Sequence, residues 1–137
     1  MTTEQKPLTV KEMRQKEAQE KSEALRKACE ALAVERYTKD QVVLWSNTHG
    51  GLFYLPLLDE NEQIEKLAIL KPINRHTLSY ASTKMEDEGL YAFLEVVMRE
   101  CWLGGDQEII DDDVYFLPAA GKLNKMIEGK KAAFVKR

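Results

Sequence analysis

The sequence is poor in the residues and runs that would point directly to a function class. Its 137 residues include only two cysteines and two histidines, and their positions show none of the spacings of a zinc site. No apolar run approaches the ~20 residues that span a bilayer, and the polar, charged beginning has no signal-peptide pattern. The formal net charge of −3 is too small to favour nucleic-acid binding. We therefore expect a cytoplasmic protein with no metal, membrane or nucleic-acid partner.

Motifs for chemistry are equally scarce. Cys29 and Cys101 lie in separate predicted helices, where we expect both to be reduced and packed as small apolar residues. The glycine pairs at 50–51 and 104–105 lack the spacing of phosphate-binding loops. The acidic residues between 106 and 113 lack the alternation, central glycine and closing glutamate of a calcium loop. The sequence therefore predicts no catalytic residue and no cofactor, and favours a protein that is not an enzyme.

The strongest structural signal is a run of apolar residues that follows Gly89. Their spacing alternates between three and one, which puts all seven on one face of a helix with 3.6 residues per turn. Gly104 and Gly105 come next, and glycine readily takes the left-handed conformation that ends a helix. We therefore predict that the central helix of the core lies between residues 89 and 106. Its buried face comprises Leu90, Phe93, Leu94, Val97, Met98, Cys101 and Trp102.

The chain before this helix predicts a long helix and then a sheet. Thr9 and Glu12 match a capping box, so we expect a helix over about 10–35, with a first half that projects as a solvated arm. Three segments rich in β-branched, aromatic or other apolar residues then predict an antiparallel β-meander. Pro56 places the second strand at an edge of the sheet or ends it early. The predicted strands cover residues 41–46, 52–58 and 64–70.

Capping residues divide the rest of the chain into helices. Asn74 is a good N-cap for a short helix that runs to about Lys84. Asp106 is expected to cap a short turn, and Asp111 or Asp112 a last helix running to about residue 130. Pro118 either kinks this last helix or begins a new one.

Together these patterns predict the α+β class. The predicted order is a long N-terminal helix, a three-stranded antiparallel β-meander and a C-terminal cluster of three to four helices packed on it. We divide the chain into an N-terminal helical arm, residues 1–39, and a globular α+β domain, residues 40–137.

Charge is unevenly distributed along the second half of the chain. Residues 85–113 carry ten acidic side chains against one base, whereas residues 122–137 carry six bases against one acid. Either this pattern complements helix dipoles on solvated faces, or the acidic surface docks a basic partner or the basic end of a neighbouring copy. Tryptophan is common at interface hot spots. The candidate partner-binding residues are Trp102, Asp106, Asp111, Asp112, Leu123, Met126 and Ile127.

Four short segments of the second half resemble parts of one protein family. Leu70–Arg75 resembles its strand, Lys-Pro step and helix start, and Arg99–Asp106 resembles its Cys-Trp-x-Gly-Gly-Asp helix end. Ile110–Asp113 resembles its acidic cap, and the segment 123–131 its amphipathic, basic terminus. Pro118 departs from the smooth final helix of that family. The family is the tail assembly chaperone-like group, small proteins encoded among the tail genes of bacteriophages and prophages.

This resemblance implies a non-enzymatic protein of virion assembly in the host cytoplasm. Such a protein binds the tape-measure protein or tail-tube subunits before the tube polymerises, and it self-associates. Two alternatives stay open. One is a phage structural component of the capsid or tail, held in the virion by its N-terminal arm. The other is a bacterial protein-interaction adaptor unrelated to phage.

Overall fold

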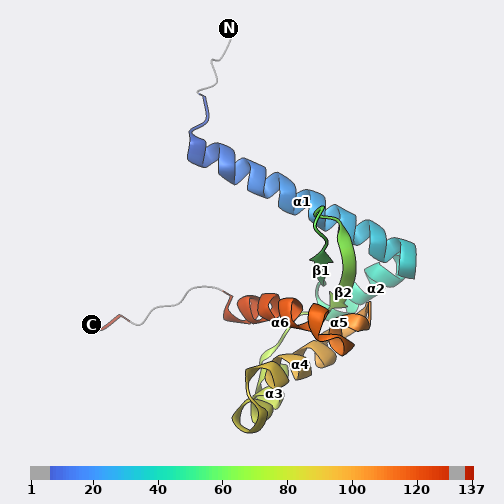
Figure 1. Cartoon of the computed structure of the whole chain (residues 1–137), viewed down its shortest axis with the longest axis vertical. Helices are drawn as coiled ribbons and strands as arrows, with labels where there is room; N and C mark the ends of the chain where they lie inside the picture. The colour runs from blue at the N-terminus through green and yellow to red at the C-terminus, as the bar shows by residue number, and fades with distance from the viewer. Residues whose placement is uncertain (1–6, 130–134) are drawn as a thin grey trace.

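The structure is a computed structural model that describes residues 7–129 and 135–137, and it confirms the α+β class. A three-stranded sheet separates two groups of helices. The long helix α1 lies across one end of the molecule, and the α3–α4 helix pair forms the other end (Figure 1). The sheet is covered on both faces, so the molecule has two apolar clusters rather than one.

Helix α1 spans Val10–Tyr37 and begins as the capping pattern predicts. The Thr9 hydroxyl accepts a hydrogen bond from the Glu12 N–H at 3.1 Å. Every residue from 10 to 24 is exposed, whereas Cys29 and Ala33 in the second half are buried against the sheet. Helix α1 therefore packs with its second half only, and the first half extends past the sheet (Figure 1).

The strand predicted at residues 41–46 is wrong, because this segment belongs to helix α2, Lys39–His49. The Thr38 hydroxyl caps the helix by accepting a hydrogen bond from the Gln41 N–H. Val42 is buried and Trp45, one turn later, packs edge-on against Tyr37 with 5.2 Å between ring centroids. This packing at helical spacing overrides the β propensity of the local sequence.

The sheet has three antiparallel strands in the order β1-β2-β3, and the third strand is not the predicted one. Strand β1 spans Phe53–Leu58 and β2 spans Ile64–Leu70, which confirms two of the predicted strands and the edge position expected from Pro56. Strand β3 is Trp102–Gly105. The meander is therefore completed by a segment that follows the central helix in sequence.

Strand β2 is the centre of the fold because both of its faces are buried. Leu67 and Ile69 pack into the cluster under α1 and α2, whereas Ala68 and Leu70 pack into the cluster under the C-terminal helices. Successive side chains of a strand point to opposite faces. A strand covered on both sides therefore shows a continuous apolar run, as residues 67–70 do.

Helices α3, Arg75–Glu88, and α4, Leu90–Cys101, form the adjoining antiparallel pair. The Asn74 side chain caps α3 through the Thr77 N–H, as predicted. Helix α4 buries five of the seven predicted positions, whereas Leu90 is exposed and Trp102 is half-buried. The predicted glycine cap is wrong, because α4 ends at Cys101 and the chain continues as β3.

The last elements are the short helix α5, Glu108–Asp111, and helix α6, Asp113–Glu128. Asp112 caps α6 by accepting a hydrogen bond from the Val114 N–H at 3.0 Å. Pro118 lies inside α6 and does not begin a separate helix. Residue 130, where this helix was predicted to end, lies outside the described residues.

Candidate functional site

The Cys-Trp-Leu-Gly-Gly-Asp string forms a junction between the two halves of the molecule. Gly105 donates its N–H to the Tyr37 hydroxyl at 2.8 Å, which connects β3 to the end of α1. Gly104 lies under two aromatic rings, since a Cβ there would be 3.0 Å from the Tyr37 ring and 3.2 Å from Trp45. Gly105 requires glycine, because it has φ +122° and its Cβ would lie 2.2 Å from the Leu67 carbonyl oxygen, whereas a Cβ at Gly104 would require the two rings to shift.

Asp106 completes this junction and does not cap α5, contrary to the prediction. Its Oδ2 atom accepts hydrogen bonds from the Leu67 N–H at 2.9 Å and from Arg36 Nη1 at 3.0 Å. Partial burial opposes ionisation, but the Leu67 N–H and the Arg36 guanidinium together hold the pKa of Asp106 below its usual range. The carboxylate therefore joins α1, β2 and β3, and its contacts are within the chain.

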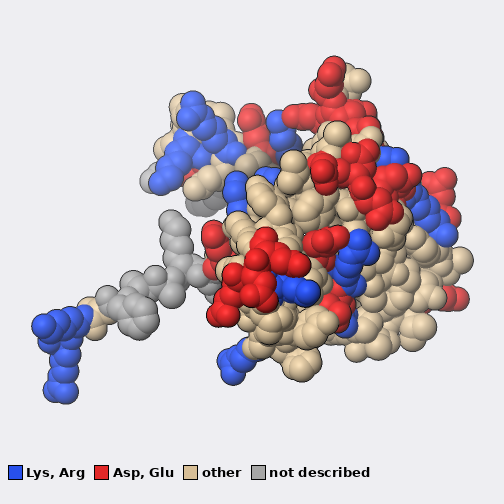
Figure 2. All heavy atoms as spheres, turned by 60° about the horizontal axis from the view of Figure 1, so that its bottom comes forward, with Lys and Arg blue, Asp and Glu red and all other residues tan. Residues whose placement is uncertain are grey.

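The other candidate residues lie in different environments. Trp102 is half-buried against the C-terminal cluster, and Leu123 is buried in its core. Asp111 and Asp112 are exposed, and Asp112 is engaged as the cap of α6. These residues do not form one continuous site. On the face of the molecule drawn in Figure 2, Asp and Glu side chains gather in separate patches with uncharged surface between them.

Met126 and Ile127 are the candidates that the structure places in a surface depression. They are half-buried and line a groove of about 230 Å³ between the end of α6, the start of β1 and the start of α3. Phe53, at the start of β1, also lines this groove and is 44% exposed. We call this the α6 groove, and its lining residues are Phe53, Pro72, Ile73, Leu78, Met126 and Ile127.

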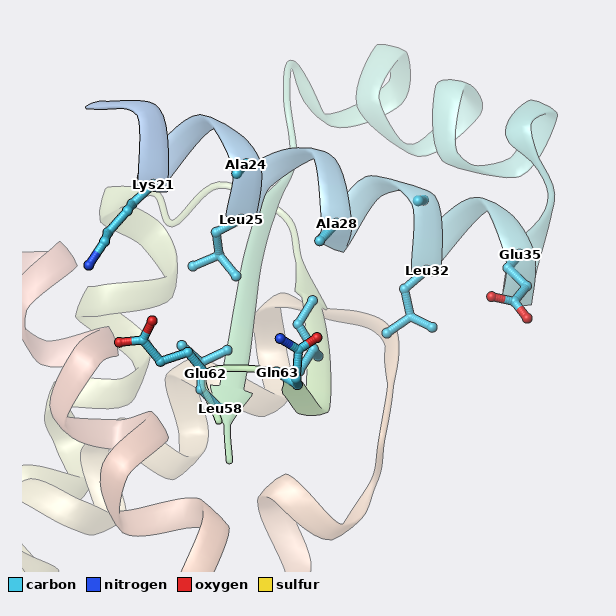
Figure 3. Close-up of a pocket in the computed structure, with 11 residues that line it drawn as sticks. Lys21, Ala24, Leu25, Ala28, Leu32, Glu35, Leu58, Glu62 and Gln63 are labelled. Atoms are coloured by element: carbon cyan, nitrogen blue, oxygen red, sulfur yellow. The ribbon is translucent and has the colours of Figure 1, made fainter. Parts of the chain in front are cut away.

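A larger groove of about 760 Å³ runs along α1 where the helix passes the β1–β2 hairpin. We call it the α1 groove. Residues 21–35 of α1 form one wall and the hairpin residues Leu58 and 62–64 form the other. Figure 3 shows Leu25, Ala28 and Leu32 along the side of the helix that faces the hairpin. The sequence does not predict this groove, because the groove depends on where the hairpin lies beside the helix.

The cysteines and the other residues that could bind a metal do not form a metal site among the described residues. Burial raises the pKa of the Cys29 and Cys101 thiols, and both are free and buried as expected. Within residues 7–129 and 135–137, no three His, Cys, Asp or Glu residues are grouped so that they could hold a metal ion. No helix in the same described ranges is long and apolar enough to cross a membrane.

Comparison of the chain with models of protein families, with curated proteins and with solved structures finds no match in any of the three.

Proposed function

We propose that this chain is a non-enzymatic phage protein of tail assembly that binds a tape-measure or tail-tube protein as an assembly chaperone. The observation that carries the proposal is the α6 groove. This apolar depression is lined in part by the last of the four segments that resemble the family, residues 123–131. Its lining side chains from α6 are Met126 and Ile127. An apolar groove of this kind accepts the apolar face of a helical segment.

The arrangement of the family-like segments supports this proposal. Leu70 pairs with Trp102 across β2 and β3, and the Lys71 N–H donates to the Cys101 carbonyl at 2.8 Å. Two of the four segments of the resemblance, Leu70–Arg75 and Arg99–Asp106, are thus direct neighbours. The first of them includes Pro72 and Ile73, which line the α6 groove. The segment Leu70–Arg75 therefore contacts the segment Arg99–Asp106 and also contributes to the wall of the α6 groove.

Charged residues of both signs adjoin the lining residues of the α6 groove in sequence, since Glu128 directly follows Ile127. Lys71 directly precedes the lining residue Pro72, and Lys125 directly precedes Met126. Lys122 lies one helical turn before Met126 on the same side of α6. The occupant that fits the apolar lining is a helical segment with an apolar stripe, and the three lysines favour carboxylates along part of its edge.

Co-purification tests this function directly. The tape-measure or tail-tube protein of the same genome is co-expressed with the tagged chain, and the retained amount is compared between variants. We expect F53S and I127D each to reduce retention at least about tenfold, because hot-spot truncation in an apolar groove costs about 2 kcal/mol or more. A V114D variant is the matched control, because Val114 is on α6 and is 74% exposed outside the groove.

The outcomes separate clearly. Equal loss in the groove variants and in V114D, with unchanged circular dichroism, contradicts a role for the α6 groove. Failure of the wild-type chain to retain either tail protein contradicts the proposed function itself.

The exposed first half of α1 favours a second candidate, a structural component held in the virion by its N-terminal arm. All residues from 10 to 24 are exposed and available to a neighbour. A chaperone leaves before the particle is complete, whereas a structural component stays. Mass spectrometry of purified virions distinguishes the two, because many retained copies per particle would replace the chaperone proposal by this one.

A further inference from the structure

The α1 groove is lined by a regular set of α1 residues. Seven residues of α1 line it over four helical turns, and they follow each other at helical spacing. The three alanines among them are exposed, and the two leucines are half-buried toward the sheet. In chain order the seven are Lys21, Ala24, Leu25, Ala28, Ala31, Leu32 and Glu35.

This surface is complementary to its own reversed copy. The lining residues are arranged symmetrically about Ala28. Ala24 lies four residues before it and Leu32 four residues after it, and Leu25 and Ala31 lie three residues before and after it. Around the helix the two leucines lie on one side of Ala28 and the two other alanines on the opposite side. When a second α1 runs antiparallel with Ala28 opposite Ala28, leucine therefore meets leucine on one side of the contact and alanine meets alanine on the other. Small residues let the helices approach closely on the alanine side, and the leucines bury apolar surface on the other.

The charges that α1 contributes at the two ends of the groove obey the same symmetry, and Glu62 of the hairpin adds a carboxylate to the opposite wall. Lys21 and Glu35 lie seven residues before and after Ala28, so each cation faces an anion of the second copy at both ends of the contact. Both side chains line the groove, and neither forms an ion pair with another described residue. A parallel arrangement in register would instead place Lys21 against Lys21 and Glu35 against Glu35.

We propose that the α1 groove binds a second copy of this chain, with the two α1 helices packed antiparallel about a two-fold axis at Ala28. Such an axis makes the contact isologous and closed, so the assembly stops at two copies through this surface. The hairpin wall adds to the contact, because Leu58 is 43% exposed and Ile64 half-buried beside the groove. This dimer is independent of the α6 groove and of any tail protein.

A charge-reversal series tests the pairing. Sedimentation equilibrium of the purified full chain between about 1 and 100 µM gives the dissociation constant of the dimer. K21E and E35K each place two like-charged pairs opposite one another, and we expect each to weaken the dimer about tenfold. The double variant K21E/E35K restores opposite charges at both ends and should return the dissociation constant close to that of the wild type.

A disulfide experiment locates the axis. In A28C the two introduced thiols lie on the two-fold axis, within reach of one another, so mild oxidation should link two chains covalently. E30C is the matched control, because residue 30 is exposed and about 200° around the helix from residue 28. The native cysteines are buried, so the wild-type chain should remain unlinked.

Three results overturn the proposal. They are a wild-type chain that stays monomeric over the whole concentration range, a dimer whose strength is unchanged by the single charge reversals, and a double variant no stronger than the single ones. Circular dichroism of each variant keeps these results interpretable. Because no tail protein is present in these experiments, their outcome is separate from that of the co-purification.

Discussion

At the scale of single residues, the junction at Gly104, Gly105 and Asp106 shows how a short motif can serve the fold. Gly104 makes room for the Tyr37 and Trp45 rings, and Gly105 brings β3 against the Leu67 carbonyl. Asp106 then accepts from Leu67 and Arg36. Each of the three residues has a steric or hydrogen-bonding reason, and all three reasons concern the attachment of α1 and α2 to the sheet.

A substitution of Gly105 by alanine should be strongly destabilising. The added Cβ would meet the Leu67 carbonyl oxygen at 2.2 Å on a backbone with φ +122°, so both the contact and the conformation are unfavourable. We expect the free energy of unfolding, measured by urea denaturation, to fall by about 2–4 kcal/mol.

The matched control is Gly121 in helix α6, where an added Cβ meets no atom within 4 Å. There alanine should raise the free energy of unfolding by about 0.5–1 kcal/mol, because it has the higher helix propensity. Similar effects at both positions would contradict the steric explanation for Gly105.

At the scale of elements, the sequence predicts helices and strands well where one signal acts alone. The caps at Thr9, Asn74 and Asp112 and the strands over 52–58 and 64–70 needed only local information. Residues 41–46 combine β-branched residues with a helical burial pattern, and contacts with Tyr37 decide between them. A prediction from local β propensity does not include such a contact, so it assigns this segment to a strand.

Strand β3 could not be predicted for a related reason. Trp102 continues the apolar spacing of α4, and a glycine pair suits a helix end as well as an extended edge strand. The pairing of Ala68 with Gly105 decides the matter, and these residues are far apart in sequence. The same limit applies to the candidate sites, because Met126 and Ile127 were identified from their stripe but their groove partner Phe53 was not.

Helix α2 itself can be tested by two neighbouring substitutions. Val42 is buried and Val43 is exposed. V42T introduces a hydroxyl into the apolar cluster and should lower the free energy of unfolding by about 1–3 kcal/mol. V43T should change it by less than about 0.5 kcal/mol, because surface substitutions seldom matter. Thermal denaturation of both variants measures the difference, and a larger cost at Val43 would show that the assigned helix face is wrong.

At the scale of the whole molecule, α1 combines two different parts in one helix. Its second half buries Cys29 and Ala33 on the sheet, whereas its first half has no buried residue between 10 and 24. The α1 groove begins at Lys21, and the packed part of the helix begins one turn later at Leu25. Folding of the chain and its proposed contact with a second copy therefore use one helix, on two of its sides.

Removal of residues 1–19 should leave the fold almost unchanged. The described residues in this range are exposed, so their loss removes only the Thr9 cap and surface helix. We expect the free energy of unfolding to change by less than about 1 kcal/mol, and the far-ultraviolet circular dichroism to lose the signal of the missing helical turns. A drop several times larger, measured by urea denaturation, would mean that the first half of α1 packs on the domain.

Each edge strand of the sheet has one backbone position that cannot donate to a further strand. On β3 the Gly105 N–H is already occupied by the Tyr37 hydroxyl, and on β1 Pro56 offers no N–H at all. Unpaired strand rims invite other chains to add to a sheet and grow into aggregates. Each edge of this sheet therefore offers one N–H fewer to a strand added by another chain.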